Sequence, residues 1–103
     1  MMQHIFRRSP TVLEGLPGLP AEVELETGAW LRGNVVDVRE GKVVLDVGRA
    51  GDAQRLASAL TARITVHAPG VEFEAVAAPA GAARGAVIEL RIGPDVEVRS
   101  HIA

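Results

Sequence analysis

The chain has 103 residues, of which 48% are hydrophobic and 23% charged, and 11 Lys and Arg against 13 Asp and Glu give a formal net charge of −2. A chain of this length buries one core, which excludes a multidomain enzyme. The slight negative charge disfavours nucleic acid and a membrane surface as partners, because both are bound through a surplus of Lys and Arg. The absence of cysteine excludes disulfides, thiolate metal sites and a cysteine nucleophile.

The first twenty residues are expected to form a leader. At the N-terminus the charges of Arg7 and Arg8 follow the apolar pair Ile5 and Phe6, which reverses the order found in a signal peptide. No apolar run approaches the roughly 20 residues that span a bilayer, so we expect a cytoplasmic protein with no membrane contact. Prolines in residues 8–20 disfavour a central strand, and the leader 1–20 is predicted to pack on the domain that follows.

Alternation of apolar and polar residues with a period of two predicts β-strands through most of residues 21–99. The predicted strands cover residues 21–26, 30–38, 42–47, 62–67, 71–75 and 87–92, with a short final strand at 96–99. Tight turns at Glu40-Gly41 and Pro69-Gly70 predict two antiparallel hairpins. The inward faces predict a core that includes Val43, Leu45, Ile64, Val66, Ile88 and Leu90, and we expect Trp30 and Phe73 to be core residues as well.

One stretch, residues 52–60, has helical spacing, with Asp52 as its N-cap and with Leu56 and Leu60 four residues apart. Gly33 indicates a bulge or a sharp bend in its strand, and the Ala- and Gly-rich residues 77–85 indicate a mobile loop. A closed barrel removes the edges that so many strands would otherwise expose. The predicted fold is therefore all-β, a small six-stranded antiparallel barrel over residues 21–99 with one short helix, followed by a tail at 100–103.

Catalytic and metal-binding residues are not expected. The histidines offer no close pair of ligands, and no serine lies in a strained turn between a strand and a helix. These residues are His4, His67, His101, Ser9, Ser58 and Ser100. No Gly-rich phosphate loop is present, and the alternating Glu22, Glu24 and Glu26 are interpreted as the solvated face of a half-buried strand. We therefore expect a protein that is not an enzyme and that has no metal and no cofactor.

One cluster of charged residues suits ligand recognition. It combines Arg7 and Arg8 in the leader with Asp37 and Arg39 at the end of the long strand. A planar guanidinium group can donate two hydrogen bonds at once to a phosphate or to the O6 and N7 edge of guanine. The alternative interpretation is that these arginines are solvated side chains beside a turn.

The order of these elements resembles the PilZ family, and more closely the related barrel at the N-terminus of flagellar brake proteins. The resemblance rests on the paired arginines, on the strand that carries Val36-Asp37-Val38-Arg39-Glu40-Gly41, and on the hairpin, short helix and strands that follow. It implies a six-stranded antiparallel barrel and a signalling or adaptor role. The typical PilZ domain binds the bacterial second messenger cyclic di-GMP through an Arg-x-x-x-Arg leader and an Asp-x-Ser-x-x-Gly turn.

That ligand motif is degenerate in this chain. Arg7 or Arg8 matches the first arginine, but Thr11 or Val12 stands where the second belongs. Asp37 matches the aspartate, whereas Arg39 occupies the serine position and Lys42 the glycine position. The resemblance therefore implies an interaction module that contacts a protein partner, and the degenerate motif disfavours the binding of cyclic di-GMP.

Two other functions stay open. Val23-Glu24-Leu25 and Leu31-Arg32-Gly33-Asn34-Val35 resemble the bent second strand of Sm-like or oligonucleotide-binding barrels, although the charge and the few aromatic residues disfavour nucleic acid as a ligand. A split barrel that holds a flavin is the second alternative. Yellow colour on purification would distinguish it.

Overall fold

The computed structural model describes residues 2–8, 13–14 and 17–102, and for residues 2–8 and 101–102 it describes the backbone only. The described elements are eight strands and one helix. In chain order they are β1 (Met2–Arg8), β2 (Pro20–Leu25), β3 (Trp30–Arg39), β4 (Lys42–Asp46), α1 (Ala50–Ala57), β5 (Ala62–Ala68), β6 (Val71–Pro79), β7 (Val87–Ile92) and β8 (Val96–Ile102).

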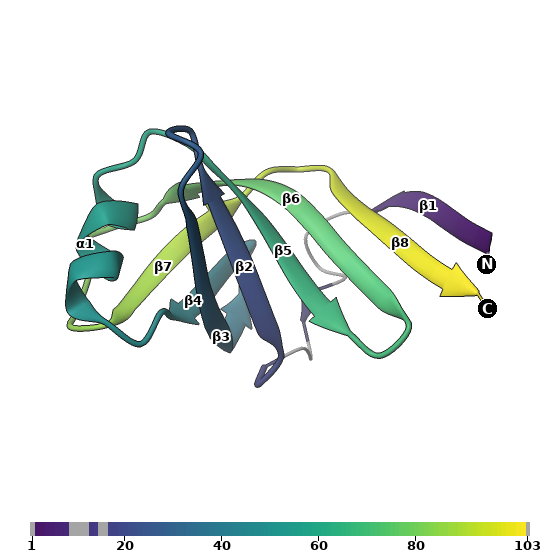
Figure 1. Cartoon of the computed structure of the whole chain (residues 1–103), viewed down its shortest axis with the longest axis horizontal. Coiled ribbons are helices and arrows are strands. Elements are labelled where there is room, and N and C mark those ends of the chain that lie inside the picture. Colours follow the sequence, from purple (N-terminus) through teal and green to yellow (C-terminus); the bar gives the residue numbers. More distant parts are fainter. Residues whose placement is uncertain (1, 9–12, 15–16, 103) are drawn as a thin grey trace.

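Six of these strands close into the predicted barrel. The ring runs β6-β5-β2-β3-β4-β7 and returns to β6, and every pairing in it is antiparallel. Both predicted hairpins, β3–β4 and β5–β6, are present. Figure 1 shows α1 at one end of the barrel, and it shows β8 and β1 extending from the other end as a ribbon. The prediction of a small antiparallel barrel with one short helix is confirmed.

The outer edge of β6 is shared by two successive strands. Its first half, Val71 to Glu74, pairs with β8, and its second half, Ala77 to Pro79, pairs with β7. Between the two pairings the chain crosses at Gly93, whose amide donates a hydrogen bond to the Val76 carbonyl oxygen at 2.8 Å. The strands β7 and β8 therefore lie end to end along β6. The strand β7 closes the barrel, and β8 extends away from it.

The inward faces of the strands form one aliphatic core. All six residues that the alternation assigned to the core are at most 2% exposed, and Phe73 is 8% exposed. Leu13, which precedes β2, is 2% exposed and belongs to the same cluster. In the part of the chain whose side chains are described, no charged or polar residue is buried. The interior is therefore filled by apolar side chains, and the polar chemistry lies on the outer surface.

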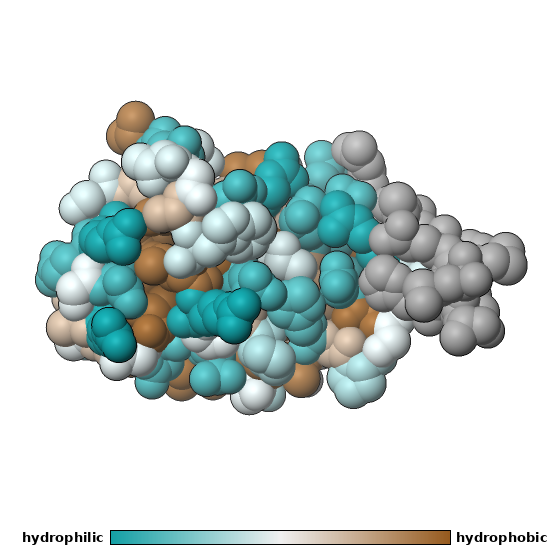
Figure 2. Space-filling view, viewed as in Figure 1, coloured by the Kyte–Doolittle hydropathy of each residue, from teal (hydrophilic) through white to brown (hydrophobic). Residues whose placement is uncertain are grey.

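The prediction that Trp30 lies in the core is wrong, because its side chain is 56% exposed. Trp30 begins β3, and the following residue, Leu31, points inward. Successive side chains of a strand alternate between faces, so Leu31 in the core places Trp30 outside. Figure 2 shows apolar surface between hydrophilic side chains, mainly over the half of the molecule that carries α1.

The helix begins earlier than predicted and ends earlier. Arg49 is at the N-cap, without a side-chain cap hydrogen bond, and Asp52 lies in the first turn. A carboxylate in the first turn is stabilised by the positive end of the helix dipole. Asp52, the predicted N-cap, is therefore favoured near the start of the helix without capping it. The helix ends at Ala57, and Leu60, which was placed on its apolar face, is 83% exposed.

Two other local predictions are corrected. Residues 77–79 belong to β6 and close the barrel against β7, so only the remainder of the predicted 77–85 loop lies outside a strand. The bulge in β3 lies between Val35 and Asp37 instead of at Gly33. Gly33 has a different role, because a Cβ atom there would collide with the Asp46 carbonyl oxygen of β4. Position 33 therefore requires glycine, because the backbones of β3 and β4 approach each other closely there.

The expected leader contains a strand that the alternation did not predict. Residues 2–8 form β1, which pairs with β8 from Met2 opposite Ile102 to Arg8 opposite Val96. The expected tail likewise continues β8 through Ile102. Thr11 and Val12 lie outside the described residues.

Truncation of the core is expected to destabilise the protein strongly. Leu45→Ala or Leu90→Ala removes a fully buried side chain, and we expect a loss of roughly 2 to 5 kcal/mol in the free energy of unfolding. Urea denaturation measures this loss. Val36→Ala, at a residue that is 51% exposed, is the matched control and should change stability by less than about 0.5 kcal/mol. Equal effects at buried and exposed positions would contradict the assignment of the strand faces.

A pair of glycine substitutions tests the close approach of β3 and β4. Gly33→Ala should destabilise the barrel, since its Cβ has no space beside Asp46. Gly51→Ala should stabilise it by up to about 1 kcal/mol, because that position is helical and open. Thermal unfolding should show a lower midpoint for Gly33→Ala and a higher one for Gly51→Ala. An unchanged midpoint for Gly33→Ala would contradict the close contact.

Candidate functional site

The four residues predicted to form a ligand site lie on two different strands. Arg7 and Arg8 are in β1, opposite Glu97 and Val96 of β8, and their side chains are outside the described residues. Asp37 and Arg39 are near the end of β3. In the order of the sheet, β8, β6, β5 and β2 lie between β1 and β3. The backbone pairing therefore brings Asp37 and Arg39 together but does not place the leader arginines beside them.

Asp37 and Arg39 form a local pair in the part of β3 that follows the bulge. Arg39 Nε lies 3.5 Å from Asp37 Oδ2, and Asp37 Oδ1 accepts a hydrogen bond from the Val38 amide at 2.9 Å. Both oxygens of the carboxylate are thus engaged by neighbours. The Arg39 side chain is 64% exposed. The pair can present a cation to a ligand, but its aspartate is occupied.

Arg39 also lines a hollow that sequence reasoning did not identify. This arginine hollow has a volume of about 520 Å³, and it lies between β3, β4, β7 and the segment after β6. Its charged lining residues are Arg39, Arg84 and Glu89. Glu89 is 3.9 Å from Lys42, so its negative charge is partly neutralised by a residue outside the hollow. The hollow has the size and the surplus of guanidinium groups that suit a small anion.

Arg84 was missed because Arg39, which lines the same hollow, is distant from it in sequence. It follows the Ala- and Gly-rich segment after β6, and its amide and carbonyl exchange hydrogen bonds with Val87 at the start of β7. This bridge holds the segment against β7 and therefore near Arg39. No local spacing indicates such a meeting, although a single arginine in a segment with few other side chains was the available signal.

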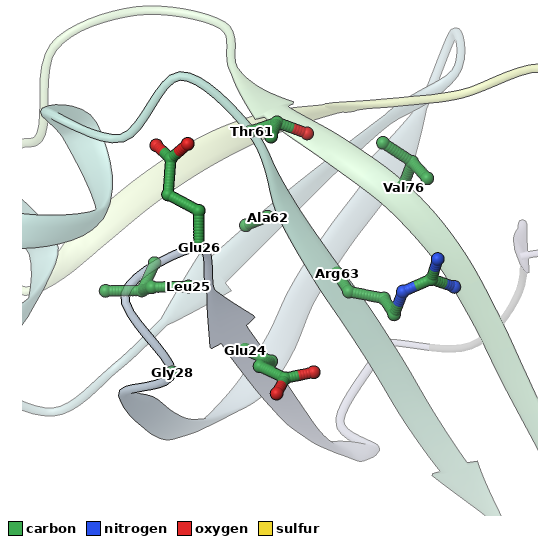
Figure 3. A pocket seen from close by; sticks show the side chains of 8 residues that line it. All are labelled: Glu24, Leu25, Glu26, Gly28, Thr61, Ala62, Arg63 and Val76. Carbon is green, nitrogen blue, oxygen red and sulfur yellow. The ribbon is translucent and has the colours of Figure 1, made fainter.

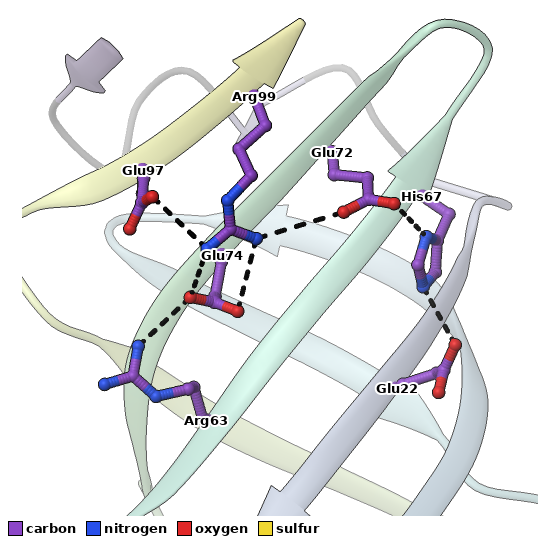
Figure 4. Close-up of polar contacts among 7 residues, drawn as sticks. All are labelled: Glu22, Arg63, His67, Glu72, Glu74, Glu97 and Arg99. Atoms are coloured by element: carbon purple, nitrogen blue, oxygen red, sulfur yellow. Dashed lines mark hydrogen bonds and ion pairs between the residues drawn. The ribbon is translucent and has the colours of Figure 1, made fainter. Parts of the chain in front are cut away.

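A network of charged side chains crosses the outer surface of β2, β5, β6 and β8 (Figure 4). At its centre, Arg99 donates hydrogen bonds to both carboxylate oxygens of Glu74, at 2.9 and 3.4 Å. Arg63 donates a further one to Glu74 at 3.1 Å. Arg99 also lies 3.2 Å from Glu97 and 3.9 Å from Glu72. The network joins β8, which lies outside the ring, to the barrel wall.

The two central groups have shifted pKa values. Burial raises the pKa of Glu74, but the hydrogen bonds and positive charges of Arg99 and Arg63 outweigh it, and the net pKa lies below the ordinary value of 4.5. The hydrogen bond from Arg99 to Glu74 raises the pKa of Arg99, against an opposing effect of burial. Both groups are therefore charged at neutral pH and hold each other in place.

His67 lies between two carboxylates at one end of this network. Its Nε2 atom is 3.0 Å from Glu22 Oε1, and its Nδ1 atom is 3.6 Å from Glu72 Oε1. The side chains of His4 and His101 are outside the described residues. Within the described part of the chain, no three His, Cys, Asp or Glu residues gather in a way that could hold a metal ion. The hydroxyl of Ser58 donates to the Gln54 carbonyl oxygen in the helix.

Comparison with known proteins identifies the fold class. No family model matches the sequence, and no curated protein matches it. The barrel with its external ribbon is a PilZ-like barrel, as the order of elements suggested.

The particular similarity is to the YcgR-N domain of YcgR from Escherichia coli, with a TM-score of 0.64 and 17% identity over 94% of this chain and 94% of that domain. The chain is also similar to YcgR from Escherichia coli in a crystal structure of its complex with c-di-GMP. That match has a TM-score of 0.69 and 18% identity, and it covers 95% of this chain but only 47% of the YcgR chain. This chain thus has the length of one YcgR domain and spans about half of the whole protein. No helix in the described residues is long and apolar enough to cross a membrane.

The lowered pKa of Glu74 predicts an acid-dependent contribution to stability. Because this pKa is lower in the folded state, the stabilisation is complete above the unfolded value and is lost as the pH falls through the folded one. Glu74→Gln should cost about 1 kcal/mol at neutral pH and little in acid. Urea denaturation at both pH values measures this. Glu89→Gln, whose partner Lys42 is 3.9 Å away, is the control and should cost less. A loss that is independent of pH would contradict the electrostatic explanation.

Proposed function

We propose that this chain is a non-catalytic regulatory or interaction module of bacterial signalling, which acts in the cytoplasm by contact with a protein partner. The observation that carries the proposal is the match to the YcgR-N domain, which covers 94% of both chains. YcgR has been crystallised in complex with c-di-GMP, and this chain corresponds in length to about half of it. A module of that kind belongs to cyclic di-GMP-linked control, including the control of motility or of behaviour on surfaces, without itself needing a ligand site.

The residues at the PilZ motif positions support contact with a protein over tight binding of cyclic di-GMP. Arg39 replaces the motif serine, and it lies 3.5 Å from Asp37, the residue of the Asp-x-Ser-x-x-Gly turn that is retained. A bulky guanidinium at this position occupies space and competes for the carboxylate. Each lost bidentate arginine contact removes roughly 1 to 3 kcal/mol, or about one to two decades of affinity.

The chemistry of the surface also weighs against the two alternative ligands. Nucleic acid would have to approach a chain with a formal net charge of −2, and the outer wall of β2, β5 and β6 carries several carboxylates. A flavin would need space for its rings, whereas the interior of the barrel is filled by aliphatic side chains. The same features suit a module that recognises proteins through its outer surface.

Calorimetry with cyclic di-GMP tests this proposal directly. We expect weak binding or none, since the motif lacks its second arginine and its serine. Should binding be detected, Arg8→Ala would abolish it if the predicted cluster is the site. Arg91→Ala, an exposed arginine of β7, is the matched control. Tight, stoichiometric binding would overturn the adaptor role, and retention of RNA at high salt would instead favour the nucleic-acid alternative.

A further inference from the structure

Three exposed apolar residues lie in, or next to, the lining of one hollow on the barrel. In the part of the chain whose side chains are described, the large hydrophobic residues that are exposed are Trp30, Val36, Leu60 and Val76. One of these four lines a hollow, and two others are next to residues that line it. Val76 lines it, Trp30 stands directly opposite the lining residue Glu24, and the amide of Leu60 donates to the carboxylate of another lining residue, Glu26, at 3.1 Å.

This second hollow, which we call the carboxylate hollow, has a volume of about 410 Å³ and lies at the end of β2 (Figure 3). Leu25 and Ala62 supply apolar surface to it, and Gly28, in the turn after β2, adds no side chain. Figure 3 shows Glu24 and Glu26 on one side of the hollow and Thr61 and Val76 on the other. The hollow therefore combines an apolar lining with carboxylates at its rim.

The charge of the hollow is not balanced. Arg63 lines it and stands opposite Glu24, but its guanidinium is hydrogen-bonded to Glu74 at 3.1 Å. Within the described residues, neither Glu24 nor Glu26 lies in an ion pair, and Glu26 accepts only the amide of Leu60. Arg32 points from the same face of β3 as Trp30 but stands beside Glu22, in the next row of the sheet. The hollow therefore offers two carboxylates that a cation could neutralise.

From this juxtaposition we infer that the carboxylate hollow is a docking site for a protein segment that presents an apolar side chain next to Lys or Arg. The apolar side chain would lie on Leu25, Ala62 and Val76, and the cation would meet Glu24 and Glu26. Trp30, which is exposed and stands beside Glu24 on the neighbouring strand, adds the kind of side chain that contributes most to interface energy. Anionic membranes and nucleic acids are repelled by the same carboxylates. This inference rests on the proposed function and specifies which surface performs it.

Selection from a random library of short peptides displayed on phage tests the inference. Peptides that bind the immobilised full chain should be enriched in apolar residues flanked by Lys or Arg. Trp30→Ala should weaken a selected synthetic peptide by about tenfold or more, as truncation of a central interface tryptophan does. Val36→Ala is the matched control, because Val36 is exposed to a similar degree but lies away from the hollow. It should leave the affinity unchanged.

A second pair of variants tests the charge. Glu24→Gln and Glu26→Gln keep the shape of the side chain, and a glutamine at position 26 can still accept the amide of Leu60. Each should weaken binding roughly two- to fivefold and reduce its dependence on salt. Glu89→Gln, on β7 across the ring, should do neither. Unfolding curves for all variants separate a loss of binding from a loss of folding.

Peptide-induced NMR shift changes separate failure of this inference from failure of the proposed function. Shifts at the amides of Glu24, Gly28, Thr61 and Val76 support the docking site. Selected peptides that bind elsewhere, or whose affinity is unchanged by Trp30→Ala, would overturn the inference and leave the interaction role intact. A selection that enriches no peptide above background would count against both.

Discussion

The structure depends on how strand β6 divides its outer edge. Residues Ala77 to Pro79 pair with β7 and close the ring, while Val71 to Glu74 pair with β8 and carry the sheet away from it. The crossing at Gly93 must pass close to β6, because a Cβ atom there would lie 3.3 Å from the Val76 carbonyl oxygen. A strand that continued straight beyond β7 could not provide both pairings. The barrel and its external ribbon are thus two results of one bend in the chain.

The surface features follow from this division. Val76 lies at the crossing, where the Gly93 amide donates to its carbonyl oxygen, and its side chain is half exposed because Ala75 and Ala77 on either side face the core. The ribbon leaves the apolar core after Val96, which is fully buried, and Val98, which packs against the core. Polar side-chain contacts add to the attachment of β8 beyond these two residues. Arg99 supplies them, because it reaches Glu74 and Glu72 on β6 while it also contacts Glu97 on its own strand. Charged side chains suit this part of β8, because they remain partly exposed to solvent there and still reach β6 with hydrogen bonds.

The sequence predicted the faces of the strands better than the contacts between them. Val43, Leu45, Ile64 and Leu90 could be assigned to the core because alternation is a local signal that burial imposes. The closure by Ala77 to Pro79 could not be predicted, because small residues followed by a proline show no alternation and resemble a loop. The meeting of Arg39 and Arg84 depends on that closure and was missed for the same reason. Asp37 and Arg39 could be paired in advance because residues two apart on a strand share a face.

A barrel with a filled interior must recognise its partners through its outer wall, and most charges on that wall already neutralise one another. The contacts between Asp37 and Arg39, Lys42 and Glu89, and Arg99 and Glu74 leave little net charge where they lie. Recognition then depends on charges that line a hollow without an ion pair in the described residues, and these include Glu24 and Glu26 in one hollow and Arg84 in another. The two hollows have opposite charge and lie on different parts of the ring. This arrangement suits a module that orients one partner against another better than one that encloses a small molecule.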